Sequence, residues 1–175
     1  MTDLLKLIRD LCLRRRGPQD MPYSVRLLVS FIAADLLLDL LAATVLGDAE
    51  GALQRFLLLT SFDLIALNIA LSLRELRPRF VQTATALIAC DVAFTLLMLP
   101  LKFAAGAPPV TPQDLTPLQV LIAWLSLGIF VWKIMVDANI LRHALNLPAI
   151  GGYLLALLWI VAEAGLLVSV FGDKL

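Results

Sequence analysis

Five long runs of apolar residues, separated by short polar connections, constrain this chain more than any other feature. Each run exceeds the roughly 20 residues that a helix needs to cross a ~30 Å hydrocarbon layer. The runs do not alternate between polar and apolar residues, as the strands of a membrane barrel must. The sequence therefore predicts an all-α membrane bundle at residues 23–175, with five transmembrane helices at residues 25–46, 53–73, 80–104, 118–141 and 148–171.

The composition gives the same answer by a separate route. Hydrophobic residues make up 61% of the 175 residues and charged residues 16%, whereas a soluble domain usually has about 45–50% and about 25%. A chain of this length cannot bury so much apolar surface in one water-exposed globule. The net charge is zero, so there is no basic excess for nucleic acid. We expect the lipid bilayer to be the main partner of the chain, and nucleic acid to be none.

Residues 1–22 are predicted to form a cytoplasmic amphipathic helix and a linker. An apolar stripe at helical spacing contains Met1, Leu4, Leu5, Ile8, Leu11 and Cys12. The basic residues off this stripe or just after it are Lys6, Arg9, Arg14, Arg15 and Arg16. Such a helix suits a membrane surface, where its basic side chains meet anionic headgroups. The alternative is a short helix packed against the protein itself, and both interpretations stay open.

The distribution of basic residues orients the predicted bundle. Ten basic residues lie on one side: Lys6, Arg9, Arg14, Arg15, Arg16, Arg26, Arg74, Arg77, Arg79 and Arg142. Three lie on the other side, namely Arg55, Lys102 and Lys174, where the predicted loops also carry Asp48, Glu50 and Asp114. Cytoplasmic loops carry an excess of Lys and Arg. We therefore expect the N-terminus in the cytoplasm and, after five spans, the C-terminus on the far side.

Charged residues inside the spans are the most informative feature for function. The predicted spans contain Asp35, Asp39, Asp63, Asp91, Lys133, Asp137 and Glu163, so every span carries an acid. A charge at the bilayer centre costs about 2.5–3.5 kcal/mol on insertion scales. Each group should therefore face the bundle interior, form a pair or become neutral by protonation. We expect Lys133 to pair with Asp137 on its own helix or with an acid on a neighbouring helix.

Two main interpretations of these acids stay open. They could line a proton or cation pathway, with Asp35, Asp39, Asp63, Asp91 and Glu163 along it and Lys133 as the counter-ion. They could instead form structural hydrogen bonds between helices, together with polar neighbours, and the sequence alone favours this second interpretation. Contact of the acids with a partner subunit is a third.

Enzyme motifs are missing from the sequence. There is no GxSxG, HExxH or phosphate-binding glycine loop. Asp63 and Asp91 lack the YD and GxGD contexts of intramembrane aspartyl proteases, because they follow Phe62 and Cys90. We therefore predict a non-enzymatic protein with no catalytic residues.

The residues that could bind a metal or a cofactor are few and scattered. No CxxC occurs, and we interpret Cys12 and Cys90 as two small apolar residues in different environments. We expect the single histidine, His143, in a loop on the cytoplasmic side, without a Cys or His at ligand spacing. The sequence predicts no metal site and no cofactor.

The stretch LRHALNL at residues 141–147, which leads into the last span, resembles the YIP family of Ypt/Rab-interacting-protein-like membrane proteins. The plan of five closely spaced spans after a cytoplasmic N-terminus is also similar, above all to short bacterial members. The DLYGP motif and the long soluble N-terminal region of eukaryotic members are missing, which argues against Rab-type partners.

The resemblance implies a non-enzymatic protein of the bacterial inner membrane that binds partners or organises the membrane, with a membrane-protein partner or a second copy of itself. It implies no particular binding residue. This is the function that the sequence favours, and the alternative is a small proton- or cation-coupled transporter that uses the intramembrane carboxylates.

Overall fold

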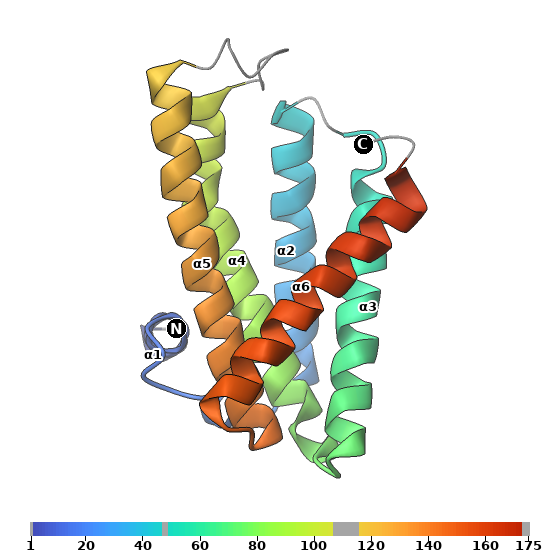
Figure 1. Ribbon diagram of the computed structural model, residues 1–175. Helices are drawn as coiled ribbons and strands as arrows, with labels where there is room; N and C mark the ends of the chain where they lie inside the picture. Colours follow the sequence, from blue (N-terminus) through green and yellow to red (C-terminus); the bar gives the residue numbers. More distant parts are fainter. Residues whose placement is uncertain (1, 47–48, 107–115, 173–175) are drawn as a thin grey trace.

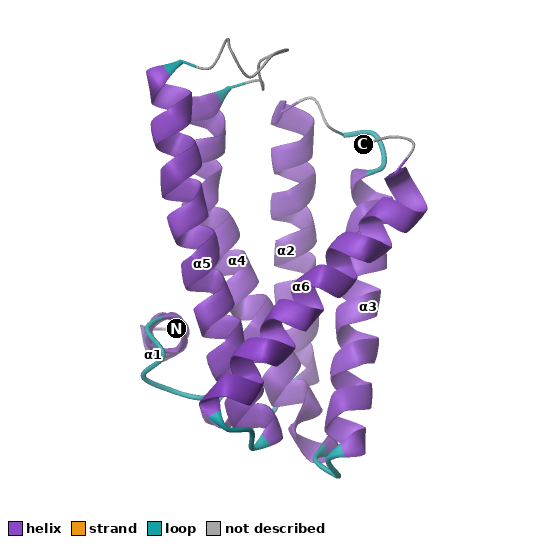
Figure 2. Cartoon of the chain, in the orientation of Figure 1, coloured by secondary structure: helices purple, strands orange, loops and turns teal. Residues whose placement is uncertain are grey.

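The computed structural model describes residues 2–46, 49–106 and 116–172, and within these ranges it consists of helices joined by short loops and turns (Figures 1 and 2). The helices are α1 (Thr2–Cys12), η1 (Pro18–Asp20), α2 (Val25–Leu46), α3 (Ala52–Leu73), η2 (Arg77–Arg79), α4 (Phe80–Ala105), α5 (Pro117–Leu145) and α6 (Ala149–Phe171). The predicted all-α class is confirmed. Met1, Asp48, Asp114 and Lys174, which entered the sequence analysis, lie outside the described residues.

Helices α2 to α6 are the five that are long and apolar enough to cross a membrane. Their bounds follow the predicted runs closely, except that α5 continues to Leu145 instead of ending at 141. The reason is local, because nothing at residues 142–145 breaks a helix. The helix ends at Asn146, which adopts a left-handed conformation (φ 53°), two residues before Pro148. His143 is therefore not in a loop but in the last turn of α5, where its Nδ1 donates to the Asn139 carbonyl oxygen at 2.7 Å.

The two ends of the bundle are packed differently. We call the end with the α3–α4 and α5–α6 connections the basic end, because Arg74, Arg77, Arg79 and Arg142 lie there. α4 packs between α2 and α5, and α6 packs on α5 at the basic end and then runs diagonally towards α3 (Figure 1). A Cβ added to Gly152 would lie 2.6 Å from the Ala138 carbonyl oxygen, so the α5–α6 contact needs this glycine.

Helix α1 lies across the bundle and is seen almost end-on in Figure 1. Its Ile8 and Leu11 side chains are buried against α4 and α5, and the Trp132 indole donates to the Cys12 carbonyl oxygen at 2.9 Å. Leu5, by contrast, is 67% exposed. Most of the apolar stripe thus packs against the protein, as in the alternative interpretation of this helix.

The basic side chains of this N-terminal region are on the outside. Lys6, Arg9, Arg14, Arg15 and Arg16 are all exposed, so their predicted contact with lipid headgroups stays a prediction. Arg9 also forms an ion pair of 2.9 Å with Asp10. The hydrogen bond from Arg9, together with the nearby charges of Arg16 and Arg15, lowers the pKa of Asp10, so this carboxyl stays ionised beside them.

The two cysteines meet in the fold, and the expectation of different environments is wrong. Cys12 at the end of α1 and Cys90 in α4 have their Sγ atoms 3.7 Å apart, and both are thiols. Their separation in sequence hid this contact, because only the docking of α1 on α4 brings them together.

This contact predicts a cross-link. Oxidation with diamide, which accepts the two electrons and two protons of the thiols, should join Cys12 to Cys90. Maleimide labelling of the denatured protein should then find no free thiol, whereas Cys12→Ser should keep its one remaining thiol under the same treatment. If both thiols of the unaltered chain stay reactive after oxidation, α1 does not dock where the structure has it.

Candidate functional site

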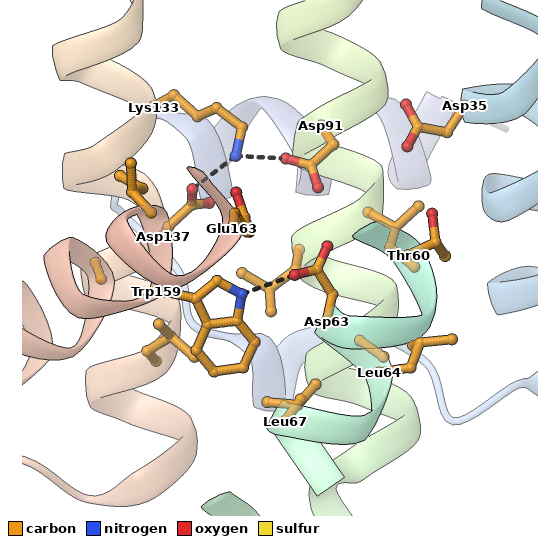
Figure 3. A pocket seen from close by; sticks show the side chains of 16 residues that line it. Asp35, Thr60, Asp63, Leu64, Leu67, Asp91, Lys133, Asp137, Trp159 and Glu163 are labelled. Atoms are coloured by element: carbon orange, nitrogen blue, oxygen red, sulfur yellow. Dashed lines mark hydrogen bonds and ion pairs between the residues drawn. The ribbon is translucent and has the colours of Figure 1, made fainter. Parts of the chain in front are cut away.

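The charged residues of the spans converge on one cavity in the middle of the bundle. The cavity has a volume of about 80 Å³. Charged side chains from all five spanning helices line it: Asp35 from α2, Asp63 from α3, Asp91 from α4, Lys133 and Asp137 from α5, and Glu163 from α6 (Figure 3). The rotation of each helix about its axis is therefore such that its charge faces the other helices.

Lys133 forms the central ion pairs of this cluster. Its Nζ lies 2.8 Å from Asp91 Oδ1 on α4 and 2.8 Å from Asp137 Oδ2 on its own helix. Residues four apart share one helix face, which explains the Asp137 contact, and the packing of α4 on α5 supplies the other. The lysine thus takes both kinds of partner that the sequence analysis named. The second oxygen of Asp137 is buried and accepts no hydrogen bond from the described residues.

A second group of side chains joins α3 to α6. The Trp159 indole donates a hydrogen bond of 2.8 Å to Asp63 Oδ1 (Figure 3). Glu163, one turn further along α6, lines the same cavity as Asp63, so carboxyl groups from two helices face one space.

The two acids of α2 occupy different places. Asp35 lines the central cavity, is half-buried and has no hydrogen-bond or ion-pair partner among the described residues. Asp39, one turn further on, is exposed and lies outside the central cavity. Asp39 instead lines a wider cavity. The other charged residues that the sequence predicted for the cluster line the central cavity.

The wider cavity connects the cluster to the end opposite the basic end. It has a volume of about 460 Å³ and shares Asp35, Asp63, Asp91, Lys133 and Glu163 with the central cavity. It also reaches Thr95, Arg55 in the first turn of α3 and Lys102 in the last turn of α4. The sequence analysis placed Arg55 and Lys102 only on the side of the membrane opposite the basic excess. Their positions at the ends of helices could have indicated that they border the opening of the wider cavity.

An apolar plug closes the cavity towards the basic end. The plug consists of Leu67, Ala84, Leu141 and Ala156, all of which line the central cavity and are at most 2% exposed. They belong to the buried core where α3, α4, α5 and α6 meet. The cavity is thus polar and open at one end and sealed by packed side chains at the other.

The Lys133 ammonium group lies at the centre of the arrangement. Within residues 2–46, 49–106 and 116–172, no three His, Cys, Asp or Glu side chains are placed to hold a metal. Trp159 was not among the residues predicted for the cluster, yet its indole donates a hydrogen bond to it. Its spacing of four residues from Glu163 could have indicated that both face the same interior.

The chain matches no family model, no curated protein and no solved structure. The resemblance to the YIP family therefore stays a prediction, and the function has to be argued from the cavity itself.

The ion pairs predict a specific pattern of stability. Removing one member of a fully buried pair costs about 3–5 kcal/mol, and because Lys133 is 33% exposed we expect Lys133→Met to lower the free energy of unfolding by about 1–3 kcal/mol. Adding Asp91→Asn and Asp137→Asn should restore much of the loss, because neither former partner of Lys133 is then left with an unpaired charge. Titration with SDS in mixed micelles, followed by circular dichroism, measures this. Lys102→Met, at an exposed position, is the control, and equal stability of the two single variants would contradict the assignment.

The cavity also predicts where water reaches the bundle. In a chain that carries Cys12→Ser and Cys90→Ser, a cysteine in place of Thr95 should react with a charged thiol reagent in nanodiscs. A cysteine in place of the neighbouring Leu96, which faces outwards and is 53% exposed, should lie in lipid and react far more slowly. Equal protection of both positions would mean that the wider cavity is dry.

Proposed function

We propose that this multi-pass membrane protein carries protons or small cations through the acidic cavity. We place it in a bacterial inner membrane with the basic end and the N-terminus in the cytoplasm, as the excess of basic residues at that end supports. On this assignment the cavity opens to the periplasm and is closed towards the cytoplasm. On this proposal the protein is not an enzyme and needs no cofactor.

The observation that carries the proposal is the charge balance of the central cavity. Five acids line it, and Lys133 is the one basic residue among its lining residues. Uncompensated charge is costly at membrane depth. Protons or bound cations must therefore offset the remaining carboxylates, so the cavity has an intrinsic affinity for positive charge. Asp35 is the strongest candidate for binding it, because it faces the cavity and has no partner among the described residues.

The shape of the cavity supports transport over static binding. Alternating access requires a site near the bilayer midplane that opens to one side at a time. Here the site lies between a wide polar opening and an apolar plug of a few small and branched side chains. Separation of α6 from α5 at Ala156 and Leu141 would open the other side. Partner binding or membrane organisation, which the family resemblance implies, remains the second proposal and rests on that resemblance.

Transport can be tested in liposomes. The purified protein should dissipate an imposed pH gradient, or a sodium or potassium gradient, as followed by a pH- or cation-sensitive dye inside the vesicles. Asp35→Asn and Glu163→Gln should reduce the flux to nearly that of empty liposomes, because each removes a cavity carboxylate without changing its shape.

Asp3→Asn removes a carboxylate from the exposed face of α1 and should leave the flux unchanged. Flux that persists in both cavity variants, or the absence of any flux from correctly folded protein, would argue against the pathway. Cross-linking in native membranes would then show whether a partner or a second copy covers the bundle.

A further inference from the structure

We infer that a separate cavity, at the basic end, binds a phosphate group at the membrane surface. It lies between the end of α1, the last turns of α5 and the start of α6, and it has a volume of about 380 Å³. It shares no lining residue with the acidic cavities. This space is large enough to admit a phosphate group.

The lining of this basic cavity is rich in hydrogen-bond donors and contains no carboxylate. The lining residues are Leu13, Arg14, Ala138, Asn139, Arg142, His143, Ala149 and Tyr153. Two guanidinium groups thus face one space. Arginine is the side chain best matched to phosphate, because its planar fork donates to two oxygens at once.

Two of these side chains lack an acceptor. The Asn139 Nδ2 atom is buried and has no hydrogen-bond partner among the described residues. The Arg142 side chain forms no hydrogen bond or ion pair with the part of the chain that the structure describes. Arg14 Nη1 donates to the Tyr153 hydroxyl at 3.3 Å, which holds its guanidinium at the cavity. The Arg142 guanidinium therefore has donors available for a phosphate oxygen.

The start of α6 adds backbone donors at the same place. Ala149, the first residue of α6, lines the cavity, and no side chain caps this helix at Pro148. The first intrahelical bond here comes from the Gly152 amide to the Pro148 carbonyl oxygen at 3.2 Å. The amides of residues 149–151 therefore have no acceptor within the helix. A helix N-terminus of this kind attracts anions through these amides and the helix dipole.

The surroundings of the cavity favour a phosphate that is carried by a lipid. The outward face of α6 leads away from the basic cavity along exposed apolar side chains, Ile150 at 74%, Leu154 at 62% and Leu157 at 50% exposure. Acyl chains could lie along this face while the headgroup phosphate meets Arg142, Asn139 and the start of α6. A free phosphate would use the same donors without the apolar face.

The test compares a phospholipid with its phosphate-free counterpart. Native mass spectrometry of the protein in neutral detergent should show that phosphatidylglycerol is retained and that a diacylglycerol with the same acyl chains is not. Arg142→Gln should weaken retention by about tenfold, as expected for the loss of a hydrogen bond to a charged group. Asn139→Asp, which keeps the shape but repels phosphate, should abolish it.

Arg26→Gln is the matched control, because it removes the same charge from an exposed residue that lies outside the cavity and outside the predicted headgroup contacts of residues 1–22. Its effect should be about twofold or less. Unchanged gel-filtration profiles and circular dichroism would exclude misfolding of the variants. If Arg142→Gln and Asn139→Asp retain phosphatidylglycerol as Arg26→Gln does, or if diacylglycerol is retained equally well, the site is wrong.

A second measurement separates the two sources of phosphate. Inorganic phosphate added to lipid-free protein should not raise the melting temperature if the headgroup is the ligand. A rise that Arg142→Gln removes would assign the same site to free phosphate. No rise and no specific lipid retention would overturn the inference.

Discussion

The cost of charge inside a hydrocarbon layer is the constraint on which this structure depends. Each spanning helix carries at least one acid, and each would be expelled from the bilayer centre if that acid faced lipid. The helices avoid this by turning their charged faces towards one another around Lys133, which pairs with Asp91 and Asp137. The same requirement that fixes the rotation of the helices also builds the cavity, so fold and candidate function have one physical origin.

The asymmetry of the cavity follows from where small residues allow the helices to approach. At the basic end, Gly152, Ala156 and Ala84 let α6, α5 and α4 pack closely, and the core there is dry. Beyond this contact α6 runs diagonally away from α5 (Figure 1). The acidic cavity therefore opens only towards the opposite end, where polar residues line it. Packing, not charge, decides which side of the cluster is accessible.

Sequence reasoning could predict the spans and the residues of the charged cluster, because length, hydropathy and insertion cost are local properties. It could not predict that Asp35 lines the central cavity while Asp39, one helical turn away, lines only the wider cavity. This difference depends on how the helices pack. It also missed the Cys12–Cys90 contact, which depends on the docking of α1. The basic cavity was hidden by the expectation that residues 142–147 form a loop. Once α5 continues to Leu145, Asn139, Arg142 and His143 share one helical face beside α6.

Helix α6 lines the acidic cavities and the basic cavity, so a ligand in the basic cavity can affect the proposed transport. Its Trp159 and Glu163 face the acidic cluster, while Ala149 and Tyr153 line the basic cavity. The plug residues Ala156 and Leu141, which would have to separate for the cavity to open towards the basic end, lie on the same two helices. A phosphate held jointly by Arg142 and the start of α6 would keep these helices together. A ligand shifts a conformational equilibrium only by its difference in affinity between the two states, so such a lipid would favour the state that is closed at the basic end and would slow transport rather than promote it.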